Sequence, residues 1–205
     1  MKQTVFLVDD DYAVLDSLQL FLIAAGLHVK SFARAEEFLS ILSPYLSGCV
    51  VLDLLLPLTS GLQVQQALDA AGCIMPIIFI TGDADVNSAV QALKAGAFDF
   101  VQKPFDNIRL LALINAALEQ EQKQREAQDI QALSQERMHT LTRREREVLA
   151  YIINGAASKT IADELKLSTR TVEVYRANVM QKMQTKSVAQ LVQMVGNIYH
   201  DSDCA

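Results

Sequence analysis

The amino-acid sequence predicts an α/β fold, with a doubly wound, five-stranded parallel sheet followed by a linker helix and a small four-helix bundle. In the first half of the 205-residue chain, five short apolar runs alternate with helical patterns, the order typical of a parallel sheet with crossover helices. Runs such as PIIFI (76–80) are apolar throughout, as expected of strands covered on both faces.

Charge also divides the chain. Residues 1–118 carry 6 lysines and arginines against 12 aspartates and glutamates, whereas residues 140–196 carry 9 against 5, which indicates two domains with different partners.

Local patterns give the elements of the first half. The strand candidates are, in order, TVFLV (4–8), HVKSF (28–32), CVVLD (49–53), IIFIT (77–81) and DFVQK (99–103). The first helix is indicated by apolar residues at helical spacing, namely Val14, Leu18, Phe21, Leu22 and Ala25. Further helical patterns cover 35–42, 61–71 and 86–94, and another begins near Asn107.

The stretch EQEQKQREAQDIQALSQER (119–137) contains no glycine or proline and is rich in helix formers. We therefore predict that the last helix of the first half continues as a polar linker helix, and a disordered charged tether is the alternative. The predicted domains are residues 1–118, a linker helix at 119–139, and residues 140–205.

The last domain is predicted to consist of four short helices. Thr142 to Glu145 (TRRE) form a capping box that opens the first of them, and Gly155 follows its end. Residues 158–165 form the second helix, Ser168 caps the third, and Ser187 opens the fourth. Short helices joined by tight turns on a basic module indicate a helix-turn-helix.

Composition excludes several classes of protein. No stretch of about 18 apolar residues lacks charge, so we expect no membrane span, and MKQTVFLVDD turns acidic too early for a secretory signal. The three cysteines are scattered and not in metal-ligand spacing, which favours a reduced, cytoplasmic location. No Gly-rich phosphate loop or dinucleotide fingerprint is present, which disfavours a flavodoxin-like redox enzyme.

Polar side chains stand where the predicted strands end, at the edge where doubly wound sheets bind ligands. They are Asp9, Asp10, Asp53, Thr81 and Lys103. Three converging carboxylates raise one another's pKa, and Mg²⁺ relieves this because it takes few protein carboxylates and keeps several waters. Lys103 and Thr81 then supply the charge and the hydroxyl that a phosphoryl group on Asp53 requires. Helix N-capping is the alternative for the first aspartates, and it is the role expected of Asp11.

These motifs resemble the receiver domain of two-component response regulators. The matching stretches, which together span residues 1–118, are VDDD, LD before LPLTSG, ITG, KAGAFDF and KPF. The resemblance implies a flavodoxin-like fold, phosphorylation of Asp53 by a histidine kinase, and a cis peptide at Lys103–Pro104. It also implies that Mg²⁺ is held by Asp9, Asp10, Asp53 and the backbone carbonyl of Leu55.

The resemblance further implies a switch in which Thr81 moves toward the phosphoryl group and leaves space for Phe100. This movement would reshape the face around Ala89, Leu93 and Phe100 into a surface for a homodimer. Phe100 as an ordinary core residue is the alternative.

The loop after Asp53 departs from the family pattern, because Leu56 and Leu58 stand where the family usually has Met and Asp. We predict that at least one or two of leucines 54, 55, 56 and 58 are exposed. The exposed ones would form an apolar contact surface for the effector domain or a partner. Core packing of these leucines is the alternative.

Residues 140–196 resemble a LuxR-type helix-turn-helix, the effector module of NarL/FixJ-like regulators, through LTRREREVL (141–149) and TVEVYR (171–176). The helix after Ser168 is expected to enter the major groove. There Glu173 would accept from a cytosine, Val174 or Ala177 would contact a thymine methyl group, and Arg176 would reach a base or a phosphate. The expected phosphate contacts are Lys159, Arg170, Tyr175, Asn178 and Lys182. Solvated surface is the alternative for the basic residues, and an ion pair with Arg170 or Arg176 is the alternative for Glu173.

The sequence thus predicts a phosphorylation-activated, DNA-binding transcriptional regulator of a two-component system. It is not expected to be an enzyme beyond its own phosphoryl transfer and hydrolysis. The expected partners are a histidine kinase, double-stranded DNA and, on activation, a second copy of the chain. An aspartyl phosphatase is disfavoured because Leu55 stands where such enzymes commonly place a second aspartate. A phosphate-independent regulator that keeps the fold only for dimerisation stays open.

Overall fold

The computed structural model describes residues 2–82 and 92–199. The chain divides into two compact units, Met1–Arg125 (the N-terminal unit) and Glu126–Ala205 (the C-terminal unit). Most of the predicted helix at 86–94, including Ala89, lies outside the described residues. No helix in the described part of the chain is long and apolar enough to span a membrane.

The described strands of the N-terminal unit form one parallel sheet of five, in the order β2-β1-β3-β4-β5. The strands are β1 (Thr4–Val8), β2 (Val29–Phe32), β3 (Gly48–Asp53), β4 (Ile77–Thr81) and β5 (Asp99–Gln102). In register, Val8 lies opposite Leu52, Asp53 opposite Ile80, and Thr81 opposite Gln102. The carboxyl ends of the strands therefore meet at one edge, and the predicted doubly wound sheet is confirmed.

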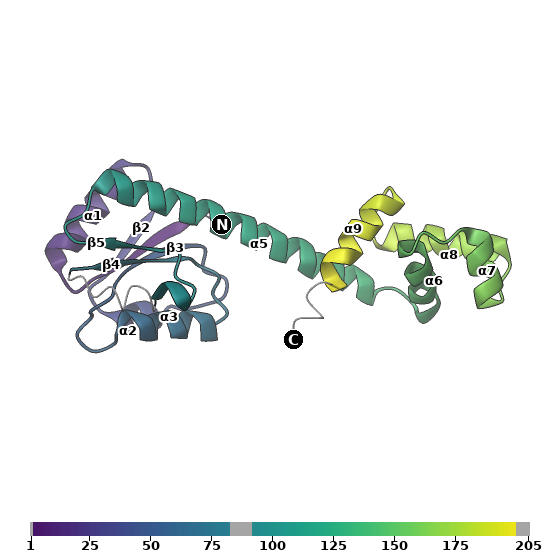
Figure 1. Ribbon diagram of the computed structural model, residues 1–205, viewed down its shortest axis with the longest axis horizontal. Coiled ribbons are helices and arrows are strands. Elements are labelled where there is room, and N and C mark those ends of the chain that lie inside the picture. Colours follow the sequence, from purple (N-terminus) through teal and green to yellow (C-terminus); the bar gives the residue numbers. More distant parts are fainter. Residues whose placement is uncertain (1, 83–91, 200–205) are drawn as a thin grey trace. The chain divides into compact units, whose positions relative to one another are not determined.

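Helices cover both faces of this sheet, as Figure 1 shows. They are α1 (Tyr12–Ala24), α2 (Ala35–Leu39), α3 (Gly61–Ala70) and the first part of α5 (Asn107–His139). Side chains alternate along each strand, so on β3 Val51 packs with α1 and α5, while Leu52 packs with α2 and α3.

Two helix starts fix the loops around the sheet edge. Asp11 is the N-cap of α1, where its carboxylate accepts from the amides of residues 13 and 14, as predicted. Ser60 and Gln63 form a capping box at α3. Gly61, the residue after Ser60, lies close to the end of β3, and a Cβ there would lie 2.8 Å from the carbonyl oxygen of Asp53.

The linker helix is also confirmed, because α5 runs without interruption for 33 residues. Beyond its apolar contacts with the sheet it carries Glu121, which is only 1% exposed. The Glu121 carboxylate accepts from Gln3 Nε2 at 2.8 Å, Ser47 Oγ at 3.2 Å and Arg125 Nε at 2.7 Å. Arg125 also donates to the carbonyl of Leu46. We call these four side chains, Gln3, Ser47, Glu121 and Arg125, the Glu121 anchor.

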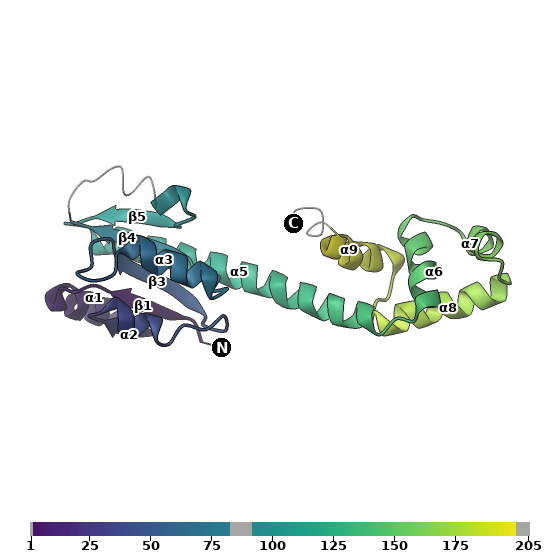
Figure 2. The same cartoon turned by 90° about the horizontal axis from the view of Figure 1, so that it is seen from below.

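The C-terminal unit contains the predicted helical bundle among its described residues. Its helices are α6 (Arg143–Ile153), α7 (Ser158–Leu165), α8 (Thr169–Lys182) and α9 (Val188–Tyr199). The predicted capping box of Thr142 and Glu145 is present, and Ser168 accepts from the Thr171 amide at the start of α8. The α8 helix packs against both α6 and α7 (Figure 2), around a core that includes Ile161 and Val172.

Candidate functional site

The edge of the sheet holds a cluster of three carboxylates. Asp9 and Asp53 are buried, at 4% and 8% exposure, and they lie close together because β1 and β3 are neighbours in the sheet. Asp10, next along the chain, is exposed. One carboxylate oxygen of each residue lies within 4.8 Å of those of the others. The sequence prediction that these three side chains converge is confirmed.

Lys103 holds the two buried carboxylates together. Its Nζ lies 2.7 Å from Asp9 Oδ2 and 2.7 Å from Asp53 Oδ2. The other oxygens accept backbone amides, that of Asp11 at Asp9 Oδ1 and that of Leu55 at Asp53 Oδ1, both at 2.9 Å. The expected cis peptide at Lys103–Pro104 is present.

Burial and the oppositely charged partners shift the pKa values of Asp9 and Lys103 in this cluster in opposite directions. Burial raises the pKa of Asp9, the Asp53 carboxylate adds to that effect, and the hydrogen bond from Lys103 offsets it only in part. For Lys103 burial lowers the pKa, but its hydrogen bonds to Asp53 and Asp9 outweigh burial and leave the pKa above its ordinary value. Lys103 is therefore charged at neutral pH, and its ammonium group is shared by the carboxylates of Asp9 and Asp53, with Asp10 close by. A convergent, all-oxygen set with excess negative charge fits a hard divalent cation.

Thr81 and Phe100 occupy the strands beside this cluster. Thr81 is 3% exposed at the end of β4, which lies between β3 and β5, and its carbonyl accepts the amide of Lys103 at 2.7 Å. Phe100 is half-buried on β5 and packs against the core on the α3 side. The structure thus places Thr81 at the strand end beside the site and Phe100 further back on β5, opposite Phe79, while the movement of both residues stays a prediction.

The leucine loop after Asp53 divides between core and surface. Leu54 is buried, whereas Leu55 is 67% and Leu58 is 76% exposed. The predicted exposure of one or two of these leucines is confirmed, and their role as a contact surface stays a prediction.

In the C-terminal unit, α8 carries an outward face. Glu173, Val174 and Ala177 are exposed, with Val174 at 55%, while Val172 and Val179 on the opposite face are fully buried. Among the other expected contacts, Lys159 and Arg170 are exposed, and Tyr175 and Asn178 are half-buried. An exposed helical face flanked by basic side chains is suited to the major groove.

Comparison with known proteins agrees with both sites. Residues 5–115 match the family described as response regulator receiver domain, and residues 139–195 match the bacterial regulatory proteins of the luxR family. The transcriptional regulatory protein FixJ of Azorhizobium caulinodans is 44% identical over 93% of this chain and 90% of its own. The response regulator protein TodT of Pseudomonas putida is 40% identical over 93% and 84%.

Among solved structures, the response regulator StyR superposes with a TM-score of 0.87 at 40% identity, over 96% of this chain and 99% of its own. Full-length FixJ from B. japonicum superposes with a TM-score of 0.60 at 39% identity, over 98% of each chain. The chain is a response regulator of the FixJ family. It is a two-component transcriptional regulator with an acidic receiver site and a LuxR-type helix-turn-helix DNA-binding domain.

Two basic residues expected to touch DNA have partners inside the bundle of this FixJ-family regulator. Lys182 Nζ lies 2.6 Å from Glu145 Oε2 and 3.3 Å from the carbonyl of Thr140. Arg176 Nη1 donates to the carbonyl of Ala156 at 3.3 Å. These cations are thus engaged in holding α8, which the pattern of charges along the sequence does not reveal.

The alternative for Glu173 is not seen, because no ion pair joins it to Arg170 or Arg176 among the described residues. The regulator also has polar residues that the sequence reasoning missed. Glu145 was recognised as a capping residue, but its ion pair with Lys182 was not. The Glu121 anchor was missed as well, although the i,i+4 spacing of Glu121 and Arg125 was a visible signal.

Proposed function

We propose that Asp53 is the phosphoryl acceptor of this regulator and that a histidine kinase is its donor. The observation that supports this is the position of Asp53 Oδ2, held 2.7 Å from Lys103 Nζ at the ligand-binding edge of the sheet. In the transfer, an Asp53 carboxylate oxygen attacks the phosphorus of a phosphohistidine. The P–N bond breaks, the imidazole nitrogen keeps the electron pair, and an acyl phosphate forms on Asp53.

The chain's own residues prepare this transfer. The Leu55 amide fixes the orientation of the Asp53 carboxylate, and Lys103 provides positive charge where the phosphoryl oxygens would lie. Asp9, Asp10, Asp53 and the Leu55 carbonyl would hold Mg²⁺, which would supply further positive charge to the phosphoryl group. Thr81 is the hydroxyl donor on the adjacent strand end, and its shift would release Phe100.

The output of the switch is control of DNA binding. The exposed face of α8 would read bases through Glu173, Val174 and Ala177, with Lys159, Arg170, Tyr175 and Asn178 at phosphates. A homodimer formed on activation would place two such helices on one operator and raise affinity through effective concentration. The face carrying Leu93, which is 39% exposed, is the surface proposed for this contact.

Intact-mass measurement tests the acceptor. The full chain would be incubated with acetyl phosphate and Mg²⁺, beside Asp53→Asn and a control, Asp69→Asn, which removes an exposed carboxylate of α3. We expect one phosphoryl group on the wild type and on the control, and none on Asp53→Asn. An unmodified wild type, or an Asp53→Asn variant that still gains a phosphoryl group, would contradict the proposal.

A further inference from the structure

The last turn of α5 belongs to the C-terminal unit and holds the end of α8. Arg137 Nη1 donates to the carbonyl of Met183 at 3.2 Å, and Nη2 donates to Gln184 Oε1 at 2.6 Å. Met183 is the C-cap of α8 and is fully buried. Gln184 follows it with a φ of 53°. One guanidinium group therefore contacts both residues at which α8 ends.

This contact satisfies a specific need of a helix end. The last carbonyls of a helix have no partners within the helix and carry partial negative charge. The planar guanidinium offers several donors in a fixed fork and always carries its charge. Arg137 thus donates to the carbonyl of the C-cap residue, complements the helix dipole, and binds the side chain of Gln184, the left-handed residue at which the chain turns.

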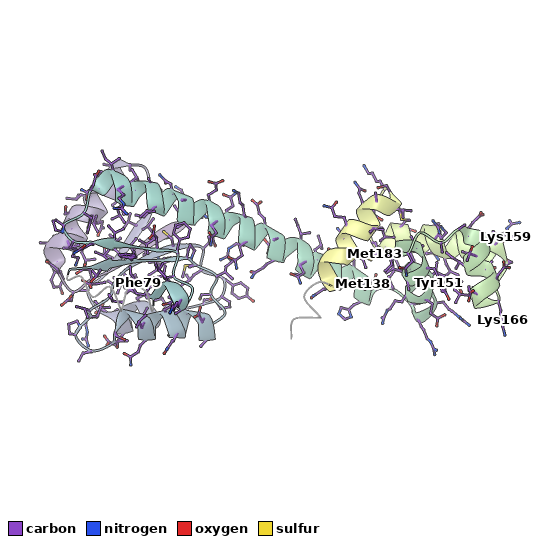
Figure 3. All side chains as sticks on the ribbon, viewed as in Figure 1. Phe79, Met138, Tyr151, Lys159, Lys166 and Met183 are labelled. Atoms are coloured by element: carbon purple, nitrogen blue, oxygen red, sulfur yellow. The ribbon has the colours of Figure 1, made fainter. Side chains whose placement is uncertain are left out.

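An ion pair and a core contact also stabilise the same end of α8. Lys182, in the last turn of α8, reaches the buried Glu145 of α6. Met138, next to Arg137, packs against the core cluster that contains Met183, and both methionines are labelled in Figure 3. The end of α8 is therefore tied to α5 by Arg137 and to α6 by Lys182.

We propose that Arg137 is a positioning residue for DNA binding, which sets the orientation of α8 without touching DNA. The match to the luxR family begins at residue 139, so this assigns a role in the DNA-binding unit to a linker residue that precedes it. Base reading depends on side chains that are held at fixed positions in the groove, whereas non-specific binding comes from electrostatic attraction to the phosphates. Loss of Arg137 should therefore weaken sequence-specific binding more than non-specific binding. This inference rests on the proposal that α8 is the recognition helix.

The test uses the full chain with two probes, a duplex obtained by in vitro selection and a scrambled duplex of the same composition. Arg137→Ala is compared with Arg144→Ala, which removes the same charge from an arginine of α6 whose side chain is 54% exposed and pairs with Glu147. We expect Arg137→Ala to bind the selected duplex about tenfold more weakly, the effect of one mismatched base pair, and to match Arg144→Ala on the scrambled duplex. Arg137→Lys, which keeps one donor to the Met183 carbonyl, should recover part of the loss.

Other outcomes overturn the inference. If both duplexes lose affinity equally and the salt dependence falls by roughly one phosphate contact, Arg137 is a phosphate ligand. If only the melting temperature falls while the ratio of the two affinities is unchanged, its role is stability alone. If Arg137→Ala does not fold, Gln184→Gly removes the Nη2 acceptor and suits the positive φ, so an unchanged affinity ratio in that variant would reject the proposal.

Substitutions on the exposed face of α8 distinguish a failure of the role proposed for Arg137 from a failure of the proposed function on which it rests. If Glu173→Ala and Val174→Ala leave the affinity ratio unchanged, the assignment of α8 as the recognition helix fails, and the inference fails with it. If they lower the ratio and Arg137→Ala does not, only the role of Arg137 is rejected.

Discussion

Lys103 is the residue on which the charge balance of the receiver site depends. Its ammonium contacts two carboxylates that burial has removed from water. Removing one partner of a buried ion pair leaves the other charge uncompensated, which costs more than the pair itself contributes. Lys103 is partly exposed, so the cost should be smaller than for a fully buried pair.

Lys103→Met should lower the free energy of unfolding of the N-terminal unit by about 2 kcal/mol at neutral pH. Without the ammonium the pKa of Asp9, which burial already raises, rises further, so the native state binds protons more tightly than the unfolded state. The loss should therefore shrink as pH falls through this raised pKa, and added Mg²⁺ should also reduce it. Urea unfolding at a series of pH values measures this, with Lys94→Met as the exposed control. A loss independent of both pH and Mg²⁺ would contradict the charge argument.

A second effect at the scale of one residue is the backbone strain at Lys166. Lys166 is the C-cap of α7 and adopts the left-handed conformation, at φ 54° and ψ 47°. A residue with a Cβ is disfavoured in this conformation by roughly 1–2 kcal/mol.

Lys166→Gly should therefore stabilise the C-terminal unit by about 0.5–1 kcal/mol, because the strain released exceeds the chain entropy that glycine adds to the unfolded state. Thermal unfolding followed by circular dichroism measures the change. Lys166→Ala removes the same charge but keeps the Cβ, so it should give no such gain. Equal effects of the two substitutions would attribute the change to charge.

At the scale of elements, α6 and α8 are joined by one buried carboxylate. Glu145 is 3% exposed and serves both the capping box of α6 and the ammonium of Lys182. Burial alone would raise the pKa of Glu145, but the hydrogen bonds from Lys182 and then from Thr142 bring it below the ordinary value of 4.5.

The stability of the α6–α8 contact should therefore decline in acid. A lowered native pKa means that the unfolded state binds protons more tightly, so this contribution is complete above about pH 4.5 and is lost as pH falls through the native pKa. Glu145→Gln should cost about 1–3 kcal/mol at neutral pH and should flatten the acid dependence. Hydrogen exchange of α8 amides across the acid range measures both effects. Glu164→Gln, on the exposed side of α7, is the control and should retain the wild-type profile.

At the scale of the whole molecule, the features that the sequence predicts best are those that the order and direction of the strands and helices determine. The five strand-end residues were found because parallel strands bring their carboxyl ends to one edge, and the repeating apolar pattern marked each strand. The α6–α9 bundle was found because capping residues and glycine punctuate it.

Other features depend on side-chain directions that no local pattern encodes. The inward turn of Lys182 and Arg176 was not predicted, because a basic residue looks the same in sequence whether it faces solvent or a carbonyl. The Glu121 anchor was missed because its partners, Gln3 and Ser47, lie more than 70 positions away in the chain.

Activation should change the assembly state of the whole chain. Beryllofluoride with Mg²⁺ mimics the acyl phosphate on Asp53, so light scattering should show the mass doubling in the wild type and no change in Asp53→Asn. We expect this because the shift of Thr81 and Phe100 would reshape an apolar face into the contact surface of a homodimer. A wild-type mass that stays constant would instead place activation in the release of one domain by the other.

The two attachments of α5 also bear on how the protein can be divided for separate study. A fragment ending at residue 118 would lose Glu121 and Arg125 and leave Gln3 and Ser47 without their buried partner. A fragment beginning at 140 would lose Arg137 and Met138, and with them the contacts of α5 with the end of α8, and would keep the pair of Lys182 with Glu145 there. A cut between 126 and 133, where Ile130 and Leu133 are exposed, spares both, so we expect halves separated there to be the ones that express in soluble form and keep their binding properties.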